Sequence, residues 1–119
     1  MKIAVTAKAA SLSAQMDPRF GRAAFILIID LDTMQFEAVD NSENVRAFEG
    51  AGIQAATMIS DRGAEVLLTG YCGPKAFKTL EVAEIKVVND MEGTVLDAVN
   101  AFREGRFTYS DGANAEAHW

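Results

Sequence analysis

The sequence predicts a single α/β domain with a five-stranded mixed sheet of spatial order 3-2-1-4-5, an antiparallel second strand and three helices. Three strand-like segments come first and can form an antiparallel meander. The later segments alternate strand and helix, which requires parallel strands joined by right-handed crossovers. The chain has 119 residues, of which 50% are hydrophobic and 24% are charged. This length and composition are typical of one soluble domain with its own core.

The first half of the chain predicts three strands and two long loops. Lys2–Thr6 and the strongly apolar Ala24–Asp30 are typical of buried strands, and Gln35–Asp40 alternates apolar and polar residues as a hairpin partner. Ala7–Gly21 has no sustained apolar period, so we expect a loop, and a connection of about 15 residues is commonly functional or mobile. Asn41–Glu49 is polar and is expected to form a second loop.

The second half predicts helices that alternate with short buried strands. The order helix, strand, helix, strand, helix is expected over Ala51–Arg62, Glu65–Leu68, Pro74–Val82, Ile85–Val88 and Val95–Phe102. Gly63 follows the first of these helices as a C-cap, and Pro74 suits a first helical position because its missing N–H is not needed there. We expect residues 1–107 to form the domain and residues 108–119 to form a tail. A chain ending after Phe107 is expected to fold and to bind its ligand normally.

In this topology, one edge of the sheet collects the features that could bind a ligand. Strands 1, 3, 4 and 5 end at this edge and strand 2 begins there, and open α/β sheets bind ligands at such edges. Three helices are also expected to begin there, after Gly50-Ala51-Gly52, Gly73-Pro74 and Gly93-Thr94. Each helix start offers unsatisfied backbone N–H groups and favours a negative charge by ~0.3–1 kcal/mol.

Basic side chains near the same edge strengthen the prediction of an anion site. Arg19 and Arg22 lie just before the second strand, and Lys75 lies at the start of a helix. The full set of expected binding residues is Arg19, Arg22, Gly50, Ala51, Gly52, Thr69, Gly70, Tyr71, Cys72, Gly73, Lys75, Gly93 and Thr94. The alternative is structural: the glycines only let the chain turn, Arg19 pairs with Asp17, and Arg22 covers the end of the sheet.

Cys72 is the only cysteine and His118 the only histidine. Cys72 follows a strand and precedes a helix, a position that should favour the thiolate and makes Cys72 a candidate metal contact. On this hypothesis, Cys72→Ser weakens ligand retention without unfolding the protein. The alternative is a small buried residue in a tight turn. His118 lies in the tail, where we expect at most an adventitious metal ligand.

Composition and motifs argue against several classes of function. A formal net charge of −6 disfavours nucleic-acid binding, no segment approaches the ~20 apolar residues of a membrane span, and a single cysteine fits a reducing cytoplasm. A magnesium-dependent nuclease of this fold would need several carboxylates on its central strands, and a nucleophilic Cys72 would need a histidine partner. The sequence has neither a zinc-binding cluster nor a P-loop pattern. We therefore expect a cytoplasmic binding protein, not an enzyme.

Five segments of the sequence together resemble the dinitrogenase iron–molybdenum cofactor biosynthesis family. They occur in the family's order and spacing and extend over nearly the whole chain up to Phe107. They are MKIAVTA at the start, DPRFGRA at Asp17–Ala23, GAGIQAA at Gly50–Ala56, LLTGYCGPKAF at Leu67–Phe77 and EGTVLDAVNAF at Glu92–Phe102. The resemblance implies a ribonuclease-H-like α/β fold and the binding or carriage of anionic metal–sulfur clusters, without turnover.

Within that family, the sequence most resembles a small bacterial member that holds a mixed molybdenum–copper sulfide cluster without covalent attachment. The sulfide bridges belong to such a cluster, so the protein need not supply thiolates. Members that carry an iron–molybdenum cofactor precursor often present a histidine or further cysteines, which this core lacks. The resemblance therefore favours the molybdenum–copper cargo, with a protein recipient that the sequence does not identify. The alternative is a regulatory or scaffold module that docks a protein partner or a nucleotide at the same edge.

Overall fold

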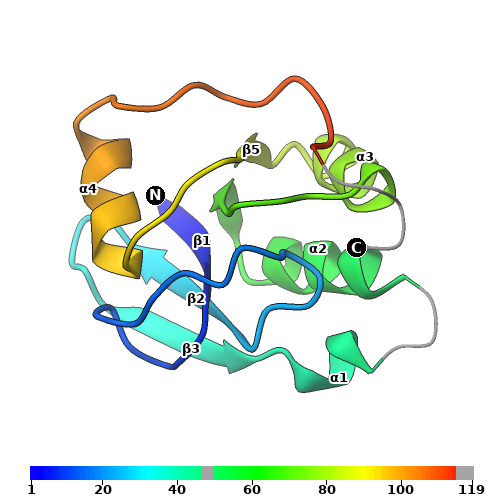
Figure 1. The fold of residues 1–119 in the computed structure, drawn as a ribbon, viewed down its shortest axis with the longest axis horizontal. Helices are drawn as coiled ribbons and strands as arrows, with labels where there is room; N and C mark the ends of the chain where they lie inside the picture. Colours follow the sequence, from blue (N-terminus) through cyan, green and yellow to red (C-terminus); the bar gives the residue numbers. More distant parts are fainter. Residues whose placement is uncertain (47–49, 115–119) are drawn as a thin grey trace.

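A computed structural model describes residues 1–46 and 50–114 and contains a five-stranded sheet of order β3-β2-β1-β4-β5 (Figure 1). The strands are β1 (Lys2–Ala7), β2 (Phe25–Asp30), β3 (Phe36–Asp40), β4 (Ala64–Leu68) and β5 (Lys86–Val88). β2 is antiparallel to both β1 and β3, whereas β1, β4 and β5 are parallel. The predicted ribonuclease-H-like strand order and the antiparallel second strand are confirmed.

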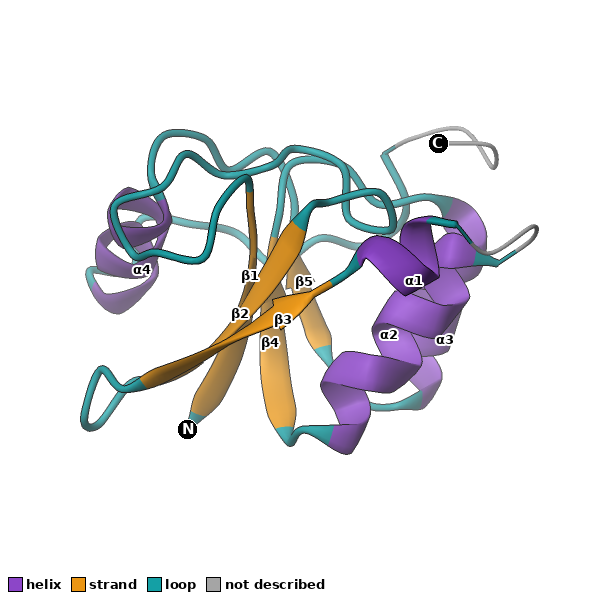
Figure 2. Ribbon diagram, turned by 90° about the horizontal axis from the view of Figure 1, so that it is seen from below, coloured by secondary structure: helices purple, strands orange, loops and turns teal. Residues whose placement is uncertain are grey.

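Helices cover both faces of this sheet. They are α1 (Ser42–Val45), α2 (Ala51–Asp61), α3 (Pro74–Val82) and α4 (Val95–Arg103). Figure 2 shows α2 and α3 side by side on one face and α4 alone on the other. The four residues of α1 fall in a segment expected to be a loop. So short a helix buries none of its residues and leaves no apolar period in the sequence.

Alternating side chains of the strands form two separate cores. Ala4 and Leu67 face α2 and α3, where they belong to a cluster with Ile59 and Leu80. The neighbouring positions in the strands point the other way, and Ile3, Val5, Leu27, Val66 and Leu68 pack with Val95 and Val99 of α4. Burying each large aliphatic side chain contributes about 1.5–3 kcal/mol, so both helical layers are held mainly by the hydrophobic effect.

The long loop between β1 and β2 is tied down at several points. The backbone N–H of Met16 donates to Gly93 O at 2.9 Å, and that of Asp17 donates to Thr6 O at 3.1 Å. Phe20 is 1% exposed and packs into the core on the α2 and α3 side. These contacts hold the loop in place across the edge of the sheet where β1 and β4 end.

The segment after α4 also makes specific contacts, although it was expected to be a tail. We call residues 106–114 the strap. It runs from α4 past β5 to the start of α3 (Figure 1). Ser110 N donates to Val87 O at 2.8 Å, and the Phe107 and Phe102 rings lie 4.7 Å apart. His118 and Trp119 lie outside the described residues. Within the described ranges, no helix is long and apolar enough to cross a membrane.

Candidate functional site

The loop of residues 17–22 lies at the sheet edge beside the turn of residues 69–73. Tyr71 N donates to Pro18 O at 2.6 Å, and Phe20 N donates to Tyr71 O at 3.1 Å, so the two segments pair like short strands. A Cβ atom on Gly70 would lie only 2.8 Å from Pro18 O. Glycine at position 70 therefore permits this approach. Figure 2 shows the loops gathered at this end of the sheet.

The other side of the 17–22 loop packs directly against the start of α2. A Cβ atom on Gly21 would lie 2.7 Å from Gly52 N, and one on Gly52 would lie 2.7 Å from Ala76 Cβ. Gly21, Gly52 and Ala76 thus join the loop to α2 and α2 to α3 through small residues. The sequence interpretation assigned Gly52 a role in ligand binding, and the structure adds a packing role for it.

Asp17 anchors the 17–22 loop from within. The residue is 5% exposed, and its carboxylate accepts hydrogen bonds from Arg19 N at 3.3 Å and Ala24 N at 3.2 Å. The Thr6 hydroxyl donates to Asp17 O at 2.6 Å and lies 3.0 Å from the Thr69 hydroxyl. Thr69 therefore supports the loop from inside the protein. Sequence analysis considered Asp17 only as an ion-pair partner and missed this role.

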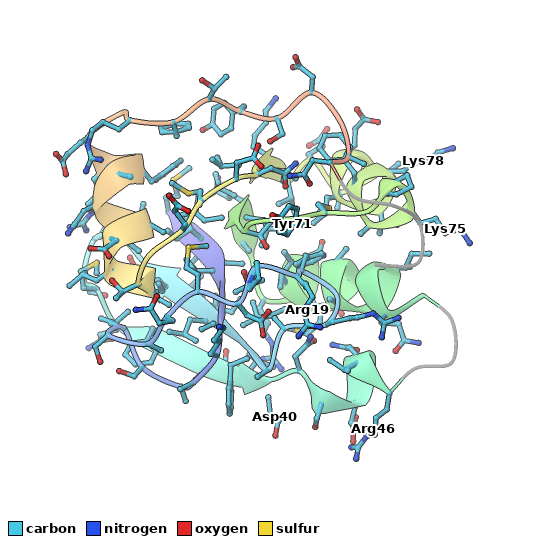
Figure 3. All side chains as sticks on the ribbon, viewed as in Figure 1. Arg19, Asp40, Arg46, Tyr71, Lys75 and Lys78 are labelled. Atoms are coloured by element: carbon cyan, nitrogen blue, oxygen red, sulfur yellow. The ribbon has the colours of Figure 1, made fainter. Side chains whose placement is uncertain are left out.

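Arg19 and Arg22 display their charges on the outside of this anchored loop. Arg19 Nε lies 3.7 Å from Asp17 Oδ1. This ion pair is the structural alternative named in the sequence analysis, yet the Arg19 side chain is 47% exposed. A pair at this distance with a half-exposed guanidinium is weak, and the guanidinium keeps other donors available. Arg22 is exposed and forms no ion pair with a residue in 1–46 or 50–114. Figure 3 shows Arg19 and Tyr71 near each other at this edge.

The Lys75 side chain does not join the two arginines. Figure 3 shows Lys75 pointing outward from α3, away from Arg19 and Tyr71. Together with Lys78, Ile53 and Val82, Lys75 lines a groove of about 490 Å³ between α2 and α3. The Lys75 ammonium group therefore lies apart from the two arginines, and its role in binding stays a prediction. The backbone N–H of Lys75 still lies at the start of α3.

The starts of α2 and α3 have backbone donors that no described residue uses. Gly50 and Gly73 are the N-caps, and neither helix has a side-chain cap. No described residue accepts a hydrogen bond from the first N–H groups of these helices, which belong to Ala51, Gly52 and Ile53 in α2 and to Lys75 and Ala76 in α3. These donors and the positive end of each helix dipole favour an anion.

The start of α4 uses the same kind of donors internally. Thr94 Oγ1 accepts from Asp97 N, and Asp97 Oδ2 accepts from Thr94 N, each at 3.0 Å. Val95 N donates to Ala14 O at 2.9 Å and Leu96 N to Leu12 O at 3.0 Å. The hydrogen bond from Thr94 N lowers the pKa of Asp97. The prediction that the start of α4 offers unsatisfied N–H groups is therefore wrong for these four residues, and a role of Gly93 in binding stays a prediction.

Cys72 is 1% exposed and belongs to the core cluster that includes Ala76 and Leu80. Burial raises the pKa of its thiol from 9.0 to about 12, because the core cannot solvate a thiolate. Burial therefore opposes the expected thiolate character. The backbone of Cys72 is bound by Asn114, whose Oδ1 accepts from Cys72 N at 2.8 Å. Sequence analysis gave no signal for Asn114.

The described residues do not form a protein-ligated metal centre of the usual kind. In residues 1–46 and 50–114, no three or more histidine, cysteine, aspartate or glutamate side chains gather to hold a metal ion. The candidate site instead offers guanidinium groups and backbone N–H donors. Such groups stabilise an anion by charge and hydrogen bonding and leave any metal in that anion with its own ligands.

Comparisons with known proteins agree on the family and the fold. A family model described as dinitrogenase iron-molybdenum cofactor matches residues 1–105. The apo form of the orange protein from Desulfovibrio gigas is 49% identical, with a TM-score of 0.93 and 96% of each chain covered. A putative NifB protein from Thermotoga is 30% identical, with a TM-score of 0.83, covering 96% of this chain and 97% of that one. An uncharacterized protein of Methanocaldococcus jannaschii is 25% identical over 94 residues, which are 77% of this chain and 80% of that protein.

Proposed function

Because this chain belongs to the dinitrogenase iron-molybdenum cofactor family, we propose that it binds an anionic metal–sulfur cluster without covalent attachment and stores or carries it. The proposed site is the sheet edge at the 17–22 loop, the 69–73 turn and the starts of α2 and α3. The proposed role is binding without turnover. The observation that carries the proposal is the placement of two exposed arginines on an anchored loop between two uncapped helix starts.

The charge of the protein makes short-range contacts decisive for such a ligand. The chain has a formal net charge of −6, so long-range attraction of an anionic cluster is unfavourable. Arg19 and Arg22 can donate charge-assisted hydrogen bonds to sulfide or oxide ligands of the cluster. Each such contact is worth about 1.5–3 kcal/mol. The backbone donors of Ala51, Gly52 and Lys75 add to them without adding a titratable group.

We propose a mixed molybdenum–copper sulfide as the cargo. The sequence resemblance to a member that holds such a cluster supports this choice. So does the burial of the Cys72 thiol, since this cluster brings its own sulfide bridges and needs no protein thiolate. An iron–molybdenum cofactor precursor is the second candidate, favoured by the name of the matching family. His118 is the only histidine of the chain, so the core has no imidazole to offer such a precursor.

Reconstitution of the purified apo protein tests both candidates. The protein is incubated with tetrathiomolybdate and a copper(I) salt, or with iron, molybdate and sulfide, and is then desalted. The expected result is a visible chromophore that elutes with the protein, with molybdenum and copper in a constant ratio to protein by metal analysis. Retention of iron and molybdenum instead would favour the precursor.

A colourless protein after every reconstitution would overturn the proposed function. In that case, the regulatory or scaffold role at the same edge becomes the better explanation. A serum albumin sample treated in the same way controls for non-specific uptake of thiomolybdate and copper. Binding that albumin reproduces at the same stoichiometry would also count against a specific site.

A further inference from the structure

Asn114, at the end of the strap, makes four hydrogen bonds to the edge of the candidate site. Its Oδ1 accepts from Cys72 N at 2.8 Å, and its own backbone N–H donates to Cys72 O at 3.1 Å. Its Nδ2 donates to Gly70 O at 2.9 Å and to Asp90 Oδ1 at 3.1 Å. One residue thus brackets the 69–73 turn and ties it to the segment that follows β5.

Other strap residues hold Asn114 in this position. Ser110 N donates to Val87 O at 2.8 Å, and Asn89 N donates to Ser110 Oγ at 2.9 Å. Asn89 Nδ2 donates to Gly112 O at 3.3 Å. The strap therefore runs along β5 with a contact at positions 110, 112 and 114. Regular contacts of this kind limit the freedom of Asn114 and lower the entropy cost of its hydrogen bonds.

The 69–73 turn, held by Asn114, positions the 17–22 loop. Gly70 packs against Pro18, and Tyr71 exchanges hydrogen bonds with Pro18 and Phe20 on either side of Arg19. A shift of the turn would therefore move the backbone that carries the Arg19 side chain. Gly70 O accepts from both Asp90 N and Asn114 Nδ2, so the turn has one support from the segment that follows β5 and one from the strap.

We propose that Asn114 is a positioning residue for ligand binding, which clamps the 69–73 turn and thereby holds Arg19 at the site. The proposal rests on the proposed function for its ligand, an anionic metal–sulfur cluster. Asn114 does not contact the cluster in this scheme. The strap then belongs to the functional domain, in contrast to the expectation that a chain ending after Phe107 binds normally.

Hydrogen exchange of the full-length apo protein tests the clamp without any cluster. In Asn114→Ala, Cys72 N loses its only acceptor among the described residues, so its amide should exchange at least about tenfold faster than in the parent. The Thr69 amide, which donates to Val88 O at 3.0 Å, should be unchanged. Asn100→Ala, at an exposed position of α4, is the matched control and should leave both amides unchanged. Unaltered exchange at Cys72 in Asn114→Ala would overturn the clamp.

Cluster retention tests the functional part of the proposal. After reconstitution with tetrathiomolybdate and copper(I), Asn114→Ala should release the chromophore about tenfold faster than the parent, and Asn100→Ala at the parent rate. Asn114→Asp keeps an acceptor but removes both Nδ2 donors and sets a carboxylate against Asp90, so it should also release faster. Equal release from all four proteins would overturn the positioning role. A parent that takes up no cluster would count against the proposed function, while the exchange result would still decide whether the clamp exists.

Discussion

The start of α4 and the starts of α2 and α3 differ in how each helix satisfies its first backbone N–H groups. At α4, a reciprocal cap between Thr94 and Asp97 and two carbonyl groups of the 7–21 loop take up these donors. At α2 and α3, glycines occupy the N-cap positions, and no described residue accepts a hydrogen bond from the first N–H groups of the helix. A glycine before a helix therefore does not by itself predict an anion site. The donors must also remain unused by the protein.

This difference divides the predicted site into a binding part and a scaffold part. The binding part consists of Arg19, Arg22 and the starts of α2 and α3. The scaffold part consists of the α4 start, which holds the 7–21 loop in place through hydrogen bonds to Ala14 and Leu12. Substitutions in the first part should affect ligand affinity, and substitutions in the second should affect stability alone.

The largest expected effect is on affinity, from removing the arginines. Arg19→Ala and Arg22→Ala should each weaken binding of the reconstituted cluster about tenfold to hundredfold, which corresponds to about 1.5–3 kcal/mol for one charge-assisted contact. Competition titration with a copper chelator measures the change, and high salt should weaken binding by the parent as well. Lys86→Ala is the matched control, because Lys86 is exposed at the start of β5, away from the edge, and its charge is screened by salt. If both arginine variants bind like the parent, the cluster lies elsewhere.

The next largest effect should come from separating the 17–22 loop from α2. In Gly21→Ala, the new Cβ would lie 2.7 Å from Gly52 N, so one backbone must shift. We expect a loss of about 1–3 kcal/mol in the free energy of unfolding, measured by urea denaturation, together with weaker cluster retention. Gly112→Ala is the control, since its Cβ would have no neighbour within 4 Å. A Gly21→Ala protein as stable as the parent would contradict the close packing described above.

The α4 cap should affect stability without affecting binding. Thr94→Ala removes the side-chain acceptor of Asp97 N and should lower the free energy of unfolding by about 1 kcal/mol. Cluster affinity should stay within twofold of the parent. A large loss of affinity without loss of stability would show that the α4 start belongs to the binding part of the site.

The smallest effect on binding is expected at Cys72. Because burial raises the pKa of its thiol to about 12, the native apo protein should react slowly with thiol reagents at pH 8, and Cys72→Ala should take up cluster normally. The unfolded thiol ionises near its ordinary pKa of 9.0, whereas the folded one stays neutral. Its contribution to stability is therefore complete below pH 9 and is lost as the pH rises towards 12.

The parent should thus lose stability more steeply than Cys72→Ala over this alkaline range, measured by urea denaturation at several pH values. Rapid labelling of the native parent at pH 8 would show that the thiol is accessible. In that case the expectation based on its sequence position, that Cys72→Ser weakens ligand retention, would regain support.

The hydrophobic pattern by itself determined the strands, the three longer helices and their order. The apolar run of Ala24–Asp30 and the apolar residues within Ala51–Arg62 are local signals, and they correspond to β2 and to α2. The parallel steps then follow from chain connectivity, because right-handed crossovers leave few arrangements. The three-residue spacing of Thr94 and Asp97 is also the sequence pattern of a capping box at the start of α4. The prediction based on Gly93 did not use this pattern.

Only the tertiary structure decided which of the predicted site residues face a ligand. The Cys72 thiol turned into the core and the Lys75 ammonium turned to the groove between α2 and α3, because packing sets the direction of a side chain in a way that local pattern does not. The contacts of Asn114 with Cys72 and Gly70 join residues more than forty positions apart in sequence. No local periodicity encodes such a contact, since it exists only after the sheet and α4 have brought the strap alongside β5.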